Sequence, residues 1–388
     1  MPLPVDPLNP AHHQNIAQSP LDVFRDLPDP RSKRNQRHKL FDIFAIAICA
    51  ILCGANDWVK VASFARKKKQ WLETFLELPN GVPSHDTFDR FFRLIDPKEF
   101  EKRFVAWTRL VADLLPGEVV AIDGKTLRGS HDKREGKAAI HCVSAFASGN
   151  QLILGQMVTE EKSNEITAIP KLLETLAISG CLVTIDAMGC QRAIAEKIIE
   201  SGADYLLALK GNQSLLANEV DNFFCQAVEA DFEGVEHVHY LFQEKNRGRQ
   251  ERREVWVTND VDWLPMLKDW KGLRSIMMIK TKRVVNGKTQ QETRLYICSL
   301  TYDALALRNA AREHWSIENT CHWVLDVTYQ EDKSRVRKDC GAENLSRLKR
   351  LTLNLLMQDK TSKKSIATKR FEAALDDQYR ELLLRNAA

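Results

Sequence analysis

Two apolar segments that each end in an aspartate constrain the fold of this chain most strongly. Residues 119–122 lead directly into Asp123, and residues 182–185 lead in the same way into Asp186. A buried strand that ends in one carboxylate holds that charge rigidly at the edge of a sheet. Either segment alone is a common pattern. Because both occur in one domain, each with a Gly shortly after its Asp, we expect a third acid to join them.

Strands and helices alternate between residues 117 and 213. Three strands joined by hairpins come first, and two further strands follow, each after a helix. Hairpin-linked strands that precede helical crossovers indicate a mixed sheet. This is the order of a ribonuclease H-like α/β fold, apart from its last helix. The predicted strands cover residues 118–123, 139–147, 151–159, 182–186 and 205–209, and the predicted helices cover residues 165–178 and 191–200.

The missing helix is predicted at residues 304–326, and it carries the third acid, Glu318. Successive residues of a helix turn by about 100°, so Glu318 shares one face with His314, Trp315 and His322. An unpaired charge on a buried face is costly. Glu318 should therefore be paired, protonated or bound to a metal.

Three carboxylates, two on strand ends and one on a helix, suit a two-metal site for phosphoryl transfer. Mg²⁺ prefers oxygen ligands and bridges to the phosphate oxygens of a substrate. A pair of such ions activates the attacking oxygen and stabilises the leaving one. We therefore expect Asp123, Asp186 and Glu318 to be metal ligands.

The part of the chain before residue 117 is predicted to be helical. Residues 1–19 are rich in Pro, Asn, His and Gln and are expected to form a flexible lead-in. Residues 20–116 suggest a small all-helical domain, in which Ser84 caps a helix. Helix-turn-helix DNA binding would suit this domain, but no pattern demonstrates it.

The run of residues 31–39 contains five basic residues and no acid. A solvated loop and an arm that contacts DNA phosphates are both consistent with this run. In the second interpretation, the contacting side chains are Arg31, Lys33, Arg34 and Arg37.

Residues 117–360 are predicted to form the catalytic domain, with an inserted β-rich subdomain at about 230–303. The charged run 244–253, which includes Arg249, is either a solvated hairpin or a ligand site. A last helix at 343–357 is expected to turn its leucines inward and its basic residues outward, namely Arg347, Lys349 and Arg350. Residues 361–388 are expected to be a basic, mobile tail.

Composition and cysteine usage indicate the compartment. The net charge is only +4, so the position of basic residues matters more than their number. The nine cysteines contain no CxxC pair, which favours a reducing cytosol over disulfides or a zinc module. The sequence shows no secretory signal and no apolar run of membrane-spanning length. We expect a cytoplasmic, nucleoid-associated protein.

Four motifs resemble those of the DDE transposases of bacterial insertion sequences, most closely the H-repeat-associated group found with Rhs elements. They are residues 122–130 (IDGKTLRGS), 186–191 (DAMGCQ), 208–213 (ALKGNQ) and 314–319 (HWSIEN). The resemblance covers roughly residues 20–360. It implies that Asp123, Asp186 and Glu318 are the catalytic acids, with Mg²⁺ as cofactor and Mn²⁺ able to substitute. It also implies cut-and-join chemistry on double-stranded DNA at element ends and target, by a homo-oligomer on DNA.

The chain departs from the wider family around the Glu. Relatives place a Tyr and an Arg shortly before it and a Lys seven residues after it, where this chain has Ala311, His314 and Leu325. Other side chains must then contact the DNA phosphates, and the candidates are Lys125, Arg128, Lys210 and Arg335, with Arg249 in the insertion. His314 and His322 each lie one turn from Glu318, so both are predicted to support it, although packing in the core would also explain them.

Three alternatives stay open at this point. His314, Glu318 and His322 could form a transition-metal site on one helix face, which would leave Asp123 and Asp186 unexplained. The chain could instead be an inactive DNA-binding remnant of a mobile element, although all three acids are intact. A host nuclease on the same fold is the third alternative, and strand-joining activity would separate it from a transposase.

Overall fold

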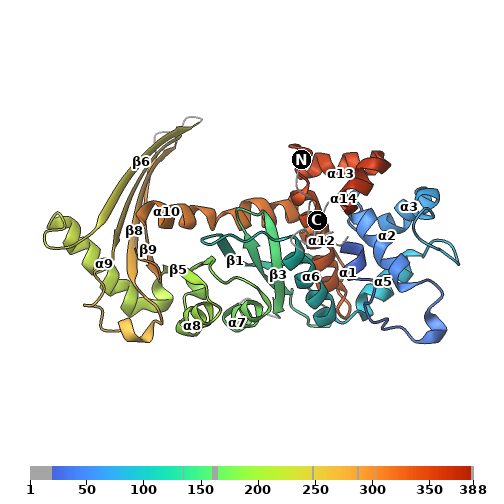
Figure 1. Ribbon diagram of the computed structural model, residues 1–388, viewed down its shortest axis with the longest axis horizontal. Coiled ribbons are helices and arrows are strands. Elements are labelled where there is room, and N and C mark those ends of the chain that lie inside the picture. The colour runs from blue at the N-terminus through green and yellow to red at the C-terminus, as the bar shows by residue number, and fades with distance from the viewer. Residues whose placement is uncertain are drawn as a thin grey trace, which may run out of the picture.

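The computed structural model describes residues 20–133, 135–159, 165–246, 249–285, 288–301 and 303–385. The molecule is elongated, with a helical bundle at one end, a sheet in the middle and a long curved ribbon of strands at the other end (Figure 1). The predicted flexible lead-in, residues 1–19, lies outside the described residues.

One nine-stranded sheet runs through the molecule, with the strand order β3-β2-β1-β4-β5-β9-β8-β7-β6. β1 is antiparallel to β2 and parallel to β4, and β4 is parallel to β5. The mixed sheet predicted from the sequence is therefore confirmed. The strands are β1 (Val119–Thr126), β2 (His141–Ala147), β3 (Leu152–Thr159), β4 (Leu182–Ile185), β5 (Asp204–Leu209), β6 (Val238–Asn246), β7 (Arg249–Thr258), β8 (Ser275–Val285) and β9 (Lys288–Cys298).

The β-rich residues expected to form an inserted subdomain extend this same sheet instead of building a separate one. β9 pairs antiparallel with β5, so that Leu206 lies opposite Cys298 and Leu209 opposite Leu295. β8, β7 and β6 then follow as antiparallel neighbours. The pairing covers the open edge that β5 would otherwise expose, and it ties the strand ribbon rigidly to the central sheet.

Helices cover both faces of the sheet, and each face has its own apolar core. α7 (Glu165–Thr175), α8 (Arg192–Glu200) and α9 (Ser214–Glu229) pack on one face. α10 (Ala304–Glu313) packs on the other face through Ala304, Leu307 and Ala311. Figure 1 shows α7 and α8 below the strands and α10 above them. We call these the α7 face and the α10 face.

Residues 20–111 form helices, but their apolar core is shared with residues 345–357 and 373–384 of the same helical bundle. Its core is rich in phenylalanine, and the rings of Phe24, Phe44 and Phe100 contact one another with centroids 4.5 to 5.4 Å apart. The Ser84 hydroxyl accepts a hydrogen bond from the Thr87 amide and caps its helix as expected. The helices are α1 (Pro20–Val23), α2 (Leu40–Leu52), α3 (Trp58–Lys67), α4 (Lys69–Leu72), α5 (His85–Leu94) and α6 (Pro97–Val111).

The prediction that Arg347, Lys349 and Arg350 face outward was wrong. They lie on α12 (Gly341–Gln358), and each is at most 2% exposed. α12 passes between the sheet and the helices α2, α5 and α6, so it has no solvent face. The buried charges are paired instead: the Arg347 guanidinium donates to Glu101 at 2.7 Å, and Arg350 donates to Glu331 at 3.0 Å.

The predicted mobile tail is largely helical. Residues 366–385 form α13 (Ile366–Leu375) and α14 (Asp377–Arg385), which pack on the bundle. Arg380 is fully buried, with its guanidinium over the Trp71 ring at 3.9 Å. The aromatic contact and the carbonyl of Ala373, to which Arg380 donates, explain why this basic segment is docked. No helix among the described residues is long and apolar enough to cross a membrane.

Lys349 generates a prediction about stability and pH. Its Nζ is buried and has no hydrogen-bond partner among the described residues. Burial lowers the pKa of Lys349 to about 8, because the attraction of Glu331 is opposed by Arg370, Arg350 and Lys125. An unfolded chain binds the proton up to its ordinary pKa of about 10.4. The free-energy cost of burying the charged Lys349 ammonium therefore has its full size below pH 8. It disappears as the pH rises towards 10, where the unfolded chain also loses the proton.

We expect Lys349→Met to raise the free energy of unfolding at pH 7, by on the order of 1–3 kcal/mol. The gain should shrink between pH 8 and pH 10. Urea denaturation of both proteins at several pH values measures this difference. A gain that is constant across that range would show that packing, and not the buried charge, is responsible.

Candidate active site

The two predicted aspartates lie at the same level of the sheet. β1 and β4 are parallel neighbours with Ile122 opposite Ile185, so the chain enters Asp123 and Asp186 side by side. Asp186 caps the short turn that follows, where its Oδ1 accepts from the Met188 amide at 3.0 Å and the Gly189 amide at 3.4 Å. Asp186 directly follows its strand, as the sequence predicts. The prediction that Asp123 ends its strand was wrong: β1 continues to Thr126, because residues 123–126 stay paired with β2.

Glu318 lies on a segment that differs from the expected continuous helix. α10 ends at Glu313, and residues Ile317–His322 form one turn of π-helix before α11 (Trp323–Val327). A π-turn inserts an extra residue and shifts the faces of the helix, and such turns are frequent at functional sites. Trp315, expected on the inward face, is 46% exposed as a result.

The π-turn brings Glu318 and His322 to Asp123. The His322 Nδ1 lies 3.2 Å from Glu318 Oε2 and 3.4 Å from Asp123 Oδ2. Burial disfavours the charged ring, but the hydrogen bonds to the two carboxylates raise the pKa of His322. The same contacts lower the pKa of Glu318, and they outweigh burial to lower the pKa of Asp123. His322 Nδ1 therefore lies between two carboxylates, and Glu318 has a partner, which is one of the three outcomes expected for it.

His314 occupies a different position. Its Nδ1 lies 3.1 Å from the Thr184 hydroxyl on β4. Burial lowers the pKa of His314, despite the attraction of Asp123 and Asp186, so the ring is neutral near pH 7. The two histidines predicted to act alike therefore differ in charge and in partner. The alternative metal site of His314, Glu318 and His322 is also not assembled, because the ligand atoms that lie within 4.8 Å of one another belong to Asp123, Glu318 and His322.

One cavity of about 360 Å³ collects the three predicted acids. Its wall also includes Lys210, His314 and Arg294, and the acids Asp123, Asp186 and Glu318 line it together. Of these, Lys210 was a predicted phosphate contact, and it follows β5 at the same edge of the sheet. The cavity therefore joins acidic side chains to basic ones.

Sequence reasoning missed two side chains of this cavity, Thr184 and Arg294. Thr184 precedes Asp186 by two residues on a strand, and strand periodicity places such residues on one side of the sheet. That signal was available. Arg294 lies on β9, more than a hundred residues from Asp186, and only the pairing of β9 with β5 brings it to the cavity.

Lys125 is not a free phosphate contact. Its ammonium is buried and lies 2.6 Å from Asp326 Oδ1 and 3.3 Å from Asp332 Oδ1. Burial opposes the charge, yet Glu331 and Asp326 raise the pKa of Lys125. Lys125 thus fastens β1 to the loop after the site helix. Arg128 is 82% exposed, with one contact of 3.5 Å to Asp332.

The basic residues of the predicted arm, 31–39, also include both a paired side chain and exposed ones. Arg31 forms a two-pronged ion pair with Asp29 and lies over the Phe91 ring, so it shapes the loop. Lys33, Arg34 and Arg37 are exposed. Arg34 and Arg37 line a cavity of about 660 Å³ with Ser84, Thr87 and Arg90 of the α5 region. Arg335 is exposed as well, whereas the side chain of Arg249 lies outside the described part of the chain.

Comparison with known proteins places the chain in a family. Residues 115–355 match the family model described as "Transposase DDE domain". Residues 21–108 match the model described as "DDE_Tnp_1-associated". The chain belongs to the DDE transposase family, and the resemblance found in its motifs is confirmed.

Two relatives match nearly the whole chain. "Putative transposase YncI" of Escherichia coli O157:H7 is 40% identical over 375 residues, which cover 96% of this chain and 95% of that protein. "H repeat-associated putative transposase YhhI" of Escherichia coli strain K12 is 38% identical over 359 residues, or 91% of this chain and 94% of that protein. A short match, 36% over 63 residues, is to "Inactive transposase YbfQ" of the same strain.

The different surroundings of the two histidines lead to a prediction. In metal-free protein, His322 should titrate above the ordinary histidine pKa of about 6.5 and His314 below it. Asp123→Asn should lower the pKa of His322, because it removes one of the two carboxylates around the ring. Ring-resolved NMR titration in the presence of a chelator measures both values, and His314→Gln and His322→Gln assign the signals. Two histidines that titrate together near 6.5 would contradict this arrangement.

Proposed function

We propose that this protein is an active transposase that cuts DNA at the ends of its element and joins the freed ends to target DNA. The single observation that supports this most is that Asp123, Asp186 and Glu318 line one cavity. The family supplies the reaction class. The cavity supplies hard oxygen ligands beside basic side chains, which suits a phosphodiester substrate.

The carboxylates are suited to divalent cations. Ligand atoms of Asp123, Glu318 and His322 lie within 4.8 Å of one another, and Glu318 and Asp186 are exposed enough to be reached. Asp186 uses Oδ1 for its backbone contacts. We propose Mg²⁺, with Mn²⁺ able to substitute, as the ion held by Asp123, Asp186 and Glu318. When bound, a pair of such ions activates the attacking oxygen and stabilises the leaving one.

The chain's own residues position the DNA and control charge at the site. Lys210 and Arg294 on the cavity wall would hold phosphate oxygens, and Arg128 and Arg335 would contact the backbone outside it. His322 balances Asp123 and Glu318 while no cation is bound, and it must give up this position or its proton when one binds. His314, tied to Thr184, supports the cavity wall as a neutral ring.

A ribonuclease H-like core is part of the same proposal. The order β3-β2-β1-β4-β5, with β1 to β3 antiparallel and β4 and β5 parallel to β1, supports it. In this core, Asp123 lies on the central strand and Asp186 on its neighbour. Glu318 lies on the π-turn after α10, and α10 follows the strand ribbon β6–β9 in the chain.

We propose further that the helical bundle contacts the element end. Lys33, Arg34 and Arg37 are exposed, and Arg34 and Arg37 lie beside the capped start of α5. A hollow with several exposed guanidinium groups and hydroxyls suits the phosphates of a duplex. Cutting and joining two ends at one target would bring copies of the chain together on the DNA.

The first functional prediction concerns the acids. Asp123→Asn and Glu318→Gln should each reduce strand cleavage in Mg²⁺ to the background, because each removes a charged metal ligand. Binding to DNA should change by less than about threefold, since no phosphate contact is lost. Asp269→Asn, an exposed carboxylate that pairs with Arg192, is the control that should cut normally.

The assay uses DNA from the boundary of the genomic element and scores cleavage and joining separately, with Mg²⁺, Mn²⁺ or Zn²⁺. Normal cutting by either acid variant would disprove the site. Cutting without joining would favour a nuclease. Binding without cutting by the unmodified protein would favour an inactive remnant.

The second functional prediction concerns the arm. The double variant Arg34→Gln, Arg37→Gln should bind the element end more weakly. Because each phosphate contact contributes about 0.9 to the salt slope of the binding constant, the slope should fall by about 2. Lys60→Gln, an exposed cation of the same bundle paired with Asp57, is the control. An unchanged slope in anisotropy titrations would place end recognition elsewhere.

A further inference from the structure

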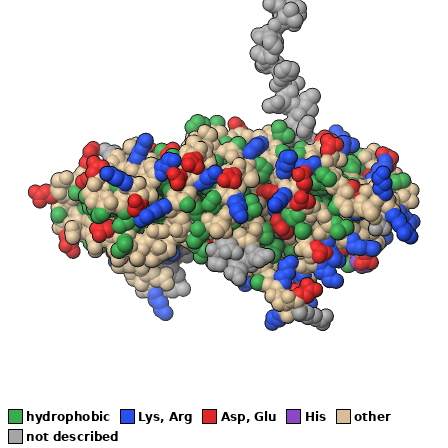
Figure 2. All heavy atoms as spheres, turned by 90° about the horizontal axis from the view of Figure 1, so that it is seen from below, with side chains coloured by type: hydrophobic (Ala, Val, Ile, Leu, Met, Phe, Trp, Pro, Cys, Tyr) green, Lys and Arg blue, Asp and Glu red, His purple; other side chains and the backbone are tan. Residues whose placement is uncertain are grey.

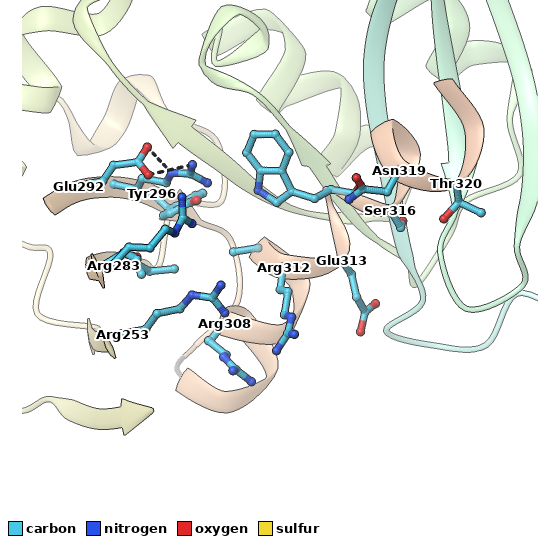
Figure 3. Close-up of a pocket in the computed structure, with 15 residues that line it drawn as sticks. Arg253, Arg283, Glu292, Tyr296, Arg308, Arg312, Glu313, Ser316, Asn319 and Thr320 are labelled. Carbon is cyan, nitrogen blue, oxygen red and sulfur yellow. Dashed lines mark hydrogen bonds and ion pairs between the residues drawn. The ribbon is translucent and has the colours of Figure 1, made fainter. Parts of the chain in front are cut away.

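A second and larger hollow, of about 850 Å³, opens on the α10 face beside the acid-lined cavity. Five arginines line it, and we call this the arginine basin. Figure 3 shows Arg253, Arg283, Arg308 and Arg312 around the hollow, on two strands and one helix. Arg253 is on β7, Arg283 on β8, Arg294 on β9, and Arg308 and Arg312 on α10.

The fold explains why these side chains meet. Arg253 lies opposite Thr281, and Arg294 lies opposite Ile279, so the three strands present them on one face. Arg308 and Arg312 are one helical turn apart on α10, whose apolar side packs on the same face. No linear motif connects the five residues. Only the long strand ribbon and α10 together create the basin.

The five arginines of the basin share three glutamate partners among the described residues, so positive charge exceeds negative charge. Among the described residues, Arg253 and Arg283 share Glu251, at 2.7 and 3.2 Å. Arg312 and Arg308 share Glu244, at 3.1 and 3.9 Å. Arg294 pairs with Glu292 at 2.8 Å. Glu313 also lines the basin, but burial and the nearby Glu118 raise its pKa and oppose its negative charge.

Part of the donor capacity is unused as well. The buried Nε atoms of Arg283 and Arg308 have no hydrogen-bond partner in the described structure. Burial and the neighbouring Arg312 and Arg253 lower the pKa of Arg308, which reports crowding of like charges. An anion with several oxygens would relieve this crowding by adding negative charge among the guanidinium groups.

The basin and the acid-lined cavity adjoin each other. Arg294, Tyr296, Ala311 and Trp315 belong to the walls of both. A nucleic-acid strand whose phosphate lies at the acids could therefore extend into the basin. By contrast, the underside of the molecule, towards α7 and α8, shows acidic and basic side chains interspersed, without one basic patch (Figure 2).

We propose that the arginine basin binds the phosphates of the DNA strand that continues from the phosphate at the acids. This rests on the proposed function, and it adds the path of the substrate beyond the site of cutting. The basin would hold that strand through several guanidinium–phosphate contacts without reading its bases. In this proposal, the strand ribbon β6–β9 presents three of the five arginines to the DNA strand.

Arg312 and Arg192 offer a matched pair of substitutions. Arg312 is 56% exposed and lies 3.1 Å from one glutamate, while Arg192 on α8 is 54% exposed and lies 3.0 Å from one aspartate. Exposed pairs of this kind contribute little to stability, so Arg312→Gln and Arg192→Gln should both fold. Thermal melting checks this. The double variant Arg253→Gln, Arg312→Gln removes two of the five arginines and should weaken DNA binding further than Arg312→Gln alone.

Full-length protein is titrated, in chelator and over a range of salt, with two DNA duplexes from the element boundary. In one, the strand ends at the phosphate to be cut, and in the other it continues for about six nucleotides. We expect the longer strand to bind the unmodified protein and Arg192→Gln more tightly. This advantage should fall about threefold to tenfold in Arg312→Gln and further in the double variant, with the salt slope lower by about 1 per arginine.

The proposal would be overturned if the longer strand bound more tightly than the shorter one by the same factor in the unmodified protein, Arg192→Gln, Arg312→Gln and the double variant. If those proteins also cut DNA in Mg²⁺, the proposed function would stand while the basin proposal fails. If the unmodified protein neither binds nor cuts either duplex, the proposed function fails too. Weaker binding of inorganic pyrophosphate by Arg312→Gln, with unchanged DNA binding, would make the basin a small-anion site and also overturn the proposal.

Discussion

The buried ion pair between Arg350 and Glu331 connects the helical bundle, the central sheet and the loop after the site helix. Arg350, fully buried on α12, donates to Glu331 at 3.0 Å and to Ser144 on β2 at 3.3 Å. Glu331 also lies 4.0 Å from the Lys125 ammonium on β1. Removing one partner of such a pair would cost about 3–5 kcal/mol, because it leaves a buried charge alone. The helical bundle, the sheet and the loop after the site helix are therefore held in one arrangement.

The site helix depends on this arrangement on its inner side. Ile317, Cys321 and Leu325 belong to the same apolar core as the helical bundle. Glu318 lies on the opposite side of this segment and points towards Asp123. The π-turn at residues 317–322 allows the apolar side chains to face the core while Glu318 faces the cavity. The helical bundle thus supports the segment that carries Glu318 through a shared apolar core.

Electrostatics divides the basic residues into two groups with different roles. Lys125, Arg31, Arg347 and Arg350 are engaged by nearby acids and hold the fold together. The exposed cations of the arm, and the five arginines of the basin, which outnumber their three glutamate partners among the described residues, are the ones that we propose to meet DNA. Burial decides between the roles, because a buried cation must be paired whereas an exposed one costs little when it is free.

The sequence alone determined the alternation of strands and helices, the mixed sheet, the family, and the two neighbouring strands that carry the aspartates, because these depend on local periodicity and on short motifs. It placed the end of β1 too early, since the pairing of residues 123–126 with β2 has no signal in an apolar run. It did not determine that Arg347, Lys349 and Arg350 are buried, since their helix has a polar side that only a second packing layer could cover. The π-turn at Glu318, which separates His322 from His314, has no signal in a 3.6-residue period. The arginine basin was equally hidden, because its members come from four elements. Tertiary structure decided these points, since each depends on which distant segments lie side by side.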